Sequence, residues 1–373
     1  MKKKTPWAIT TLVPDTIYTD REEFIESFYG EALKTATRRS MSTVLLGMRR
    51  MGKTEIFKRV VNRLFFEQDH TDPEAVVPVY YSFEDEDVDR SKFALDYVEN
   101  FVRWYAAFRL RKPGLIGRSE ISRENLPVFI KNNMEITRGF QKALNLLEWI
   151  PKDNVTLPED AAVNIPRTVS DRDDASIVMF LDEFQNTHLP QYKFRIVGFM
   201  QNAVESPTCP HFVTGSAMSI LVNEILGRGA LFGRFDSEEI EPFTDYYGKE
   251  LVLKARSFFG ASIPDVMAPV ISDRCGGNPF YITALVRQAV KQDEPVASEE
   301  ALNELLGLDI SSGFIWAELS DQVERWMERI NGKKITKWIL YLAALDPEAR
   351  ISLERIQEEL RRREKKDVPL NEI

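Results

Sequence analysis

The sequence predicts an α/β fold, in which a parallel sheet carries helices on its faces and a helical region follows. Four short apolar runs, STVLLG, AVVPVYYSF, SIVMFLDEF and HFVTGS, have the composition of buried strands. Helical patterns separate several of them, and such an alternation is typical of a parallel sheet. A glycine-bounded loop joins the first strand to a helix, and helical patterns dominate from about residue 246 onward.

Composition bounds the class of protein. At 373 residues, a prior of about 150 residues per domain predicts two or three domains. The apolar runs fall short of the roughly 18 residues that a membrane span needs, and the N-terminus lacks the pattern of a secretory signal. We therefore expect a cytoplasmic protein without membrane contact. The net charge of −9 argues against a surface that attracts nucleic acid over its whole extent.

The elements around the glycine loop follow from hydrophobic spacing. Apolar residues between positions 24 and 33 have helical spacing, and Asp20 is the predicted N-cap. After the loop, two sets of apolar residues each recur every four positions, which predicts a helix with a broad apolar face. Pro78 has no backbone N–H to donate, which argues against a central position in the sheet for the second strand.

Residues 91–175 form a long insertion between the second and third strands. Residues 91–150 are predicted to be helical, and the aromatic residues between Phe101 and Phe108 favour core packing over a base-stacking surface. Residues 151–175 contain three prolines and no clear periodicity, so we predict a long loop there. For the acidic segment 83–90, a solvated loop is favoured over a wall of the nucleotide site.

The glycine loop has the pattern G-x-x-x-x-G-K-T from Gly47 to Thr54. Its glycines allow the backbone N–H groups to surround a phosphate, and the N-terminus of the following helix adds positive potential. Lys53 would neutralise the β- and γ-phosphates, and the Thr54 hydroxyl would be offered to Mg²⁺. The apolar run before Asp182 and Glu183 predicts a strand that ends in two acids. Asp182 would hold the magnesium shell and Glu183 would polarise the attacking water.

Two further segments have open interpretations. In HFVTGSAMSIL, Thr214 and Ser216 would reach the γ-phosphate or form a plain Thr-Gly-Ser turn. In CGGNPFYITALVRQAV, Pro279 fits the first turn of a helix. That helix would close over the nucleotide or merely follow an interdomain turn.

The segment GRGALFGRFDSEEIEPF has two balanced interpretations. Arg228 and Arg234 are flanked by glycines and could reach charge on a transferred phosphoryl group. Alternatively, they form surface salt bridges with Glu238 or Glu239.

Six segments in order, YTDREEF, GMRRMGKTE, MFLDEFQ, VTGSAMSIL, LFGRF and CGGNPFYI, resemble the archaeal-type ATPase family. That family lies in the STAND branch of the P-loop ATPases related to AAA+ proteins. The resemblance covers about residues 18–290. It implies a P-loop NTPase sheet of the ASCE type, a helical lid and, in many relatives, a winged-helix domain.

By position, the resemblance also implies roles for individual residues. Arg21 would lie near the base and Pro279 in the lid. The catalytic set would be Lys53, Glu183, Ser216 as sensor and Arg234, and the magnesium set Thr54 and Asp182. Nucleotide contacts would come from Gly47, Arg49, Arg50, Met51, Gly52, Lys53, Thr54, Glu55, Arg21 and Pro279.

The expected organisation has four parts. These are an N-terminal extension (1–17), a P-loop ATPase core (18–240) with the insertion at about 91–175, a helical lid (241–320) and a winged-helix-like, apparently incomplete region (321–373). Five basic residues between positions 361 and 366 could contact phosphates, although a solvated helix end is favoured.

We expect a Mg²⁺-dependent ATPase that binds ATP and ADP and acts as a switch for a protein or nucleic-acid partner. The alternative is an oligomeric, ATP-dependent DNA-binding machine, such as a loader or a transposition or defence regulator. In either class nucleotide could drive homo-oligomer formation. A nucleotide-bound scaffold with little turnover is a third hypothesis, against which Lys53 and Glu183 argue together.

Overall fold

The structure is a computed structural model that describes residues 7–86, 88–188, 194, 196–330, 335–345 and 351–370. Its centre is a five-stranded sheet in the order β2-β3-β4-β1-β5, in which every strand pair is parallel. The strands are β1 (Thr43–Leu46), β2 (Val77–Ser82), β3 (Ile177–Asp182), β4 (His211–Thr214) and β5 (Asp236–Glu239). The predicted α/β fold class is confirmed, and β4 lies between the strand of the glycine loop and the strand of the two acids.

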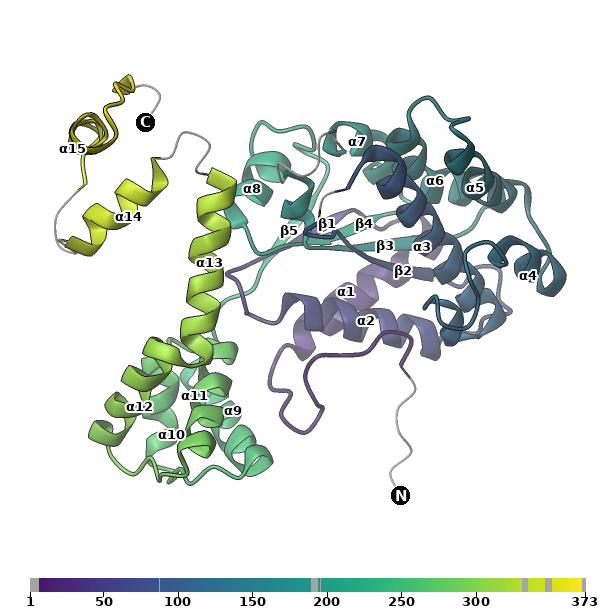
Figure 1. The fold of residues 1–373 in the computed structure, drawn as a ribbon. Helices are drawn as coiled ribbons and strands as arrows, with labels where there is room; N and C mark the ends of the chain where they lie inside the picture. The colour runs from purple at the N-terminus through teal and green to yellow at the C-terminus, as the bar shows by residue number, and fades with distance from the viewer. Residues whose placement is uncertain are drawn as a thin grey trace.

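Helices cover both faces of the sheet (Figure 1). On one face lie α1 (Glu22–Leu33) and α2 (Lys53–Glu67), and on the other α3 (Arg90–Leu110), α5 (Arg138–Trp149), α6 (Pro158–Asp173) and α7 (Met200–Val204). The predicted broad apolar face of α2 is confirmed, since Ile56, Val60 and Leu64 have no exposed surface. Parallel strands have their carboxyl ends at one edge, so the segments after β1, β3 and β4 meet there.

Two local predictions were wrong. Residues 151–175 are mostly helical, because α6 buries Ala162, Val163 and Val169 despite Pro166 in its interior. These residues recur at helical spacing, which the prolines obscured. Asp20 is not the N-cap of α1. Arg21 occupies that position with φ 78°, and its side chain makes no capping hydrogen bond.

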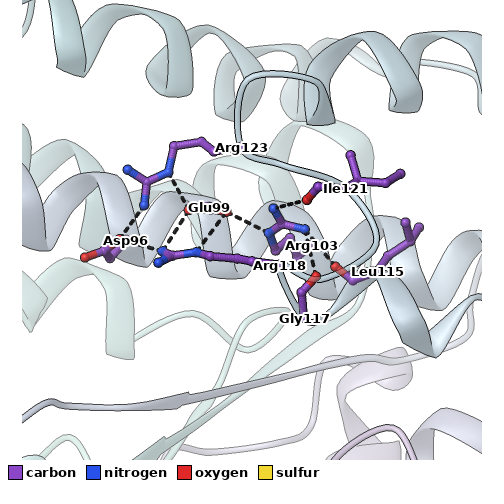
Figure 2. Close-up of polar contacts among 8 residues, drawn as sticks. All are labelled: Asp96, Glu99, Arg103, Leu115, Gly117, Arg118, Ile121 and Arg123. Carbon is purple, nitrogen blue, oxygen red and sulfur yellow. Dashed lines mark hydrogen bonds and ion pairs between the residues drawn. The ribbon is translucent and has the colours of Figure 1, made fainter.

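The insertion contains a network of charges that we call the Glu99 cluster, in which Glu99 and Arg103 are buried: Asp96, Glu99, Arg103, Arg118 and Arg123 (Figure 2). Arg103 donates to Glu99 at 2.7 Å and also to the carbonyls of three residues in the loop after α3. Arg118 and Arg123 bind Glu99 from the same loop. The predicted packing role of the neighbouring aromatic residues is confirmed, since Phe101, Trp104, Tyr105 and Phe108 are buried.

A second hydrophobic cluster lies in the helices after β5. These are α9 (Asp245–Phe259), α10 (Met267–Arg274), α11 (Pro279–Gln292), α12 (Glu299–Ser312) and α13 (Phe314–Ile330). Pro279 lies in the first turn of α11, as predicted, and the Asn278 side chain caps the same helix. Figure 1 shows α13 running from these helices past the sheet toward the C-terminal segment. The boundary expected at residue 320 falls inside α13.

The C-terminal segment contains α14 (Thr336–Leu345) and α15 (Leu353–Glu359), which pack through a small third cluster. The basic helix end after α15 is paired with acids of its own segment: Arg362 and Arg363 with Glu359, and Arg361 with Asp367. The predicted N-terminal extension (1–17) and the predicted C-terminal region (321–373) lie partly outside the described residues. Among the helices that are described, none is long and apolar enough to cross a membrane.

Candidate functional site

The glycine loop leaves β1 and enters α2 with the backbone shape that its sequence predicts. Gly47 has φ 148°, and a Cβ atom there would lie 2.2 Å from a side-chain carbon of Ile240. Gly52 is the N-cap of α2 with φ 96°, and no side chain caps the helix. Because the first N–H groups of a helix have no intrahelical partners, the N-terminus of α2 can accept an anion.

Lys53 is buried against this loop. Its Nζ donates to the carbonyl oxygens of Gly47 and Met48, both at 2.7 Å. Burial lowers its pKa to about 8, although the charges of Asp182 and Glu183 oppose the shift. An anion next to Nζ would favour the charged form, so this lysine fits a phosphate.

Asp182 ends β3 and is 2% exposed. It accepts a hydrogen bond from the hydroxyl of Tyr80 on the neighbouring strand at 2.7 Å. Burial and the charge of Glu183 raise the pKa of Asp182, while hydrogen bonds from Tyr80 and Thr54 oppose that rise. Carboxylate and hydroxyl oxygens are ligands that Mg²⁺ prefers, and a cation would relieve the unfavourable burial of this charge. Thr54 and Asp182 therefore fit a magnesium ion.

Glu183 and Ser216 follow β3 and β4 and both line the same cleft. Glu183 has φ 52°, an uncommon conformation for a residue with a side chain. Its carboxylate accepts a hydrogen bond from Gln185, whose amide oxygen accepts the Ser216 N–H at 2.9 Å. The predicted water activator and the predicted sensor are thus joined by one buried side chain.

Arg49 and Arg50, at the tip of the glycine loop, pair with acids of α13. Both contact Glu318, at 2.8 and 2.6 Å, and Arg49 also contacts Asp321 at 2.7 Å. Burial would raise the pKa of Glu318, but hydrogen bonds from Arg50 and Gln322 and the charges of both arginines hold it below its usual value. We call Arg49, Arg50, Glu318 and Asp321 the Glu318 cluster.

The cleft is also lined by the segment before α1 and by α9 and α11. Arg21 is 6% exposed, donates to the Glu241 carbonyl at 2.7 Å and lies 4.4 Å from the ring centroid of Phe243. Its Nε is buried without a hydrogen-bond partner. Glu55 accepts the N–H of Leu12 at 2.7 Å, so its carboxylate anchors the N-terminal segment against α2.

These elements enclose a cleft of about 730 Å³. Pockets for small molecules commonly have such volumes. The predicted residues that line it are Arg21, Arg49, Arg50, Met51, Gly52, Lys53, Thr54, Glu55, Asp182, Glu183, Ser216 and Pro279. Tyr80, Gln185, Glu318 and Asp321 were not predicted. Glu318 and Asp321 lie more than 260 positions from the loop, and no local pattern marks such a contact.

The structure places Arg234 elsewhere. It is not among the residues that line the cleft, and it forms an ion pair with Glu205 at 2.8 Å. The alternative prediction was a salt bridge with Glu238 or Glu239, whereas the acid that Arg234 contacts is Glu205. Gly47 is also outside the lining, because it packs against Ile240. Among the described residues, no group of three or more His, Cys, Asp and Glu is arranged to hold a metal.

Comparison with solved structures supports the fold. No family model matches the chain, and no curated protein matches it significantly. The Walker-type ATPase PABY2304 of Pyrococcus abyssi aligns over 98% of this chain and 89% of its own, with 14% identity and a TM-score of 0.56. The Aeropyrum pernix ORC1 protein, solved in complex with DNA, aligns over 96% and 83%, with 14% identity and a TM-score of 0.50. The chain has the parallel-sheet fold of P-loop ATPases.

Proposed function

We propose that this protein binds ATP with Mg²⁺, hydrolyses it, and passes its nucleotide state to the C-terminal segment through α13. One observation carries the proposal: a single cleft brings together a phosphate loop, a buried lysine, two acids after β3 and a hydroxyl after β4. These are the parts that phosphoryl transfer requires for positioning and charge stabilisation.

In the proposed reaction, water attacks the γ-phosphorus and the bond to the β-phosphate oxygen breaks, which yields ADP and phosphate. Glu183 would accept the proton of the attacking water. Lys53 and the N–H groups of the loop and α2 would stabilise the phosphate charge. Magnesium, held by Thr54 and Asp182, would neutralise part of the same charge.

The Glu318 cluster supports the switch. Arg49 and Arg50 line the cleft while Glu318 and Asp321 hold them from α13. Phosphates in the loop would compete for these arginines, because an anion and a carboxylate attract the same guanidinium. Nucleotide state would therefore bias the position of α13. We also propose that the chain belongs to the STAND branch and that its last segment has a winged-helix form.

Hydrolysis and its dependence on Glu183 test the proposal. We expect wild-type protein to hydrolyse ATP only with Mg²⁺. Glu183→Gln should keep nucleotide affinity and slow turnover by about 100-fold or more, because the amide keeps the shape but cannot accept the proton. Loss of affinity together with turnover would mean that Glu183 holds the fold or the metal instead. Nucleotide binding without measurable wild-type turnover would favour the scaffold hypothesis.

A DNA-binding machine is the alternative, and the fold shared with a DNA-bound ORC1 structure favours it. The pairing of Arg361, Arg362 and Arg363 with acids of their own segment argues against it. DNA affinity that falls steeply with salt would support this alternative, whereas no DNA binding in ATP would favour a protein partner.

In an oligomer, Arg234 would act on the site of a neighbouring subunit, since it lies outside the cleft of its own chain. Arg234→Ala should then lower turnover at least about tenfold with little change in melting temperature. Mixing it with Glu183→Gln should restore activity, because a mixed interface pairs an intact Glu183 with an intact Arg234. Unchanged turnover in Arg234→Ala would exclude a catalytic role for this arginine.

A further inference from the structure

Gln185 lies directly behind the wall of the cleft. It belongs to the short helix Phe184–His188 after β3, and its side chain is 1% exposed. Its Nε2 donates to the Glu183 carboxylate, and its Oε1 accepts the Ser216 N–H at 2.9 Å. One buried amide therefore connects the groups that follow two neighbouring strands.

The backbone around Gln185 is shaped to allow this connection. A Cβ atom on Gly215 would lie 2.1 Å from Gln185 Oε1, so a larger residue there would displace the amide. Glu183 has φ 52°, a strained conformation for a residue with a side chain, and such strain clusters at functional sites. The absence of a side chain at Gly215 leaves room for the amide, and the backbone conformation of Glu183 accompanies the contact of its carboxylate with that amide.

We propose that Gln185 is a positioning residue for Glu183, an inference that rests on the proposed ATPase function. Its N–H group binds one oxygen of the Glu183 carboxylate and leaves the other for the attacking water. The Ser216 N–H fixes the amide from the other side. When the Ser216 hydroxyl contacts the terminal phosphate, Gln185 transmits that contact to Glu183, so the proton acceptor is aligned only in the triphosphate state.

The chemistry of the side chain explains why an amide suits this position. Glutamine offers both a donor and an acceptor and carries no charge. A glutamate would keep the acceptor for Ser216 but place a second carboxylate beside Glu183. A methionine of similar length would fill the space and make neither hydrogen bond. The glutamate variant therefore loses only the hydrogen bond to Glu183, whereas the methionine variant loses the hydrogen bonds with both Glu183 and Ser216.

A double-mutant cycle tests the proposal. ATP turnover and ADP affinity are measured for wild type, Gln185→Met, Glu183→Gln and the double variant. We expect Gln185→Met to lower kcat about tenfold or more, a part of the 10²–10⁴-fold that a positioned proton acceptor contributes. ADP affinity should stay within about twofold. In the Glu183→Gln background Gln185→Met should cause little further loss, because residues that act through one another are not additive.

Gln185→Glu provides a second variant that keeps the Ser216 hydrogen bond, and we expect a loss of kcat similar to that of Gln185→Met. A purely structural role would instead give additive losses in the Glu183→Gln background, with reduced ADP affinity and melting temperature. That result, or wild-type turnover in either Gln185 variant, would overturn the inference alone. Wild-type protein without Glu183-dependent hydrolysis would defeat the proposed function, and this inference with it.

Discussion

The Glu99 and Glu318 clusters use the same chemistry in different places. In each, a glutamate that is 1% or 4% exposed is held by two or more arginines. The Glu99 cluster joins α3 to the loop that follows it, within 27 positions of the sequence (Figure 2). The Glu318 cluster joins the glycine loop to α13, 268 positions away.

The difference lies in Arg103, since the other arginines of the Glu99 cluster, Arg118 and Arg123, have side chains that are 60% and 29% exposed. The side chain of Arg103 is 2% exposed and its other donors bind carbonyls of the same loop. A ligand therefore cannot compete with Glu99 for this guanidinium. Arg49 and Arg50 have side chains that are 23% and 46% exposed and face the cleft. A buried pair such as Arg103 and Glu99 stabilises a local structure, whereas a pair at the edge of a cleft can exchange partners. We therefore expect the first to be static and the second to respond to ligand.

The largest expected effect is on stability, at Glu99. Glu99→Ala should lower the free energy of unfolding by about 3–5 kcal/mol, because it leaves the Arg103 charge buried without its carboxylate. Glu318→Ala is the matched control and should cost about 1 kcal/mol or less, since its arginines can turn to water. Urea unfolding of both variants measures the difference. Equal losses in the free energy of unfolding would mean that the two clusters stabilise the fold to the same extent.

The next effect is on chemistry, at Lys53. Lys53→Ala should reduce ATP turnover by about 100-fold or more, because the phosphates lose their buried counter-charge. Glu99→Ala, assayed where it is folded, should retain the turnover of wild type per folded molecule. Steady-state hydrolysis of both variants is the measurement. If Lys53→Ala turned over ATP at the wild-type rate, the phosphates would not bind at Lys53 as proposed.

The sequence predicted the local motifs and most of the strands, but not the contacts between distant residues. The glycine loop, the acids after β3 and four of the five strands have local patterns that depend on neighbouring residues only. The fifth strand, Asp236–Glu239, consists of polar residues at the sheet edge, so hydrophobicity could not reveal it. Gln185 lay within a quoted motif, but its role depends on Ser216, 31 positions away. Long-range pairing of charges, as at Glu318, leaves no periodic trace in one sequence.

A smaller effect is expected on affinity, at Glu318. Glu318→Gln should tighten ATP binding by about two- to fivefold, equal to about 0.4–1 kcal/mol, because the phosphates no longer compete with its charge for Arg49 and Arg50. Titration calorimetry measures the affinity. Limited proteolysis with and without ATP should show that α13 changes its protection more in wild type than in the variant. Weaker ATP binding would mean that Glu318 prepares the arginines for phosphate and does not compete with it.

The smallest expected effect is the pH dependence that Lys53 confers. Its pKa is lowered from the ordinary 10.5 to about 8 by burial, and its Nζ donates to the carbonyl oxygens of Gly47 and Met48. The folded protein loses this proton as pH rises through about 8, while the unfolded chain keeps it until about 10.5. The cost to stability is therefore fully present below pH 8 and is relieved between these two values.

Nucleotide should reverse this shift, because phosphate charge favours the protonated amine. Affinity for ATP should then fall as pH rises above about 8, and binding at pH 8 should take up about half a proton at Lys53. Calorimetry in two buffers of different ionisation enthalpy measures the uptake. Lys53→Arg is the matched control, since a guanidinium stays charged throughout this range, and protonation of the nucleotide itself is common to both proteins. Equal uptake by wild type and Lys53→Arg would show that the lysine is already charged in the free protein at pH 8.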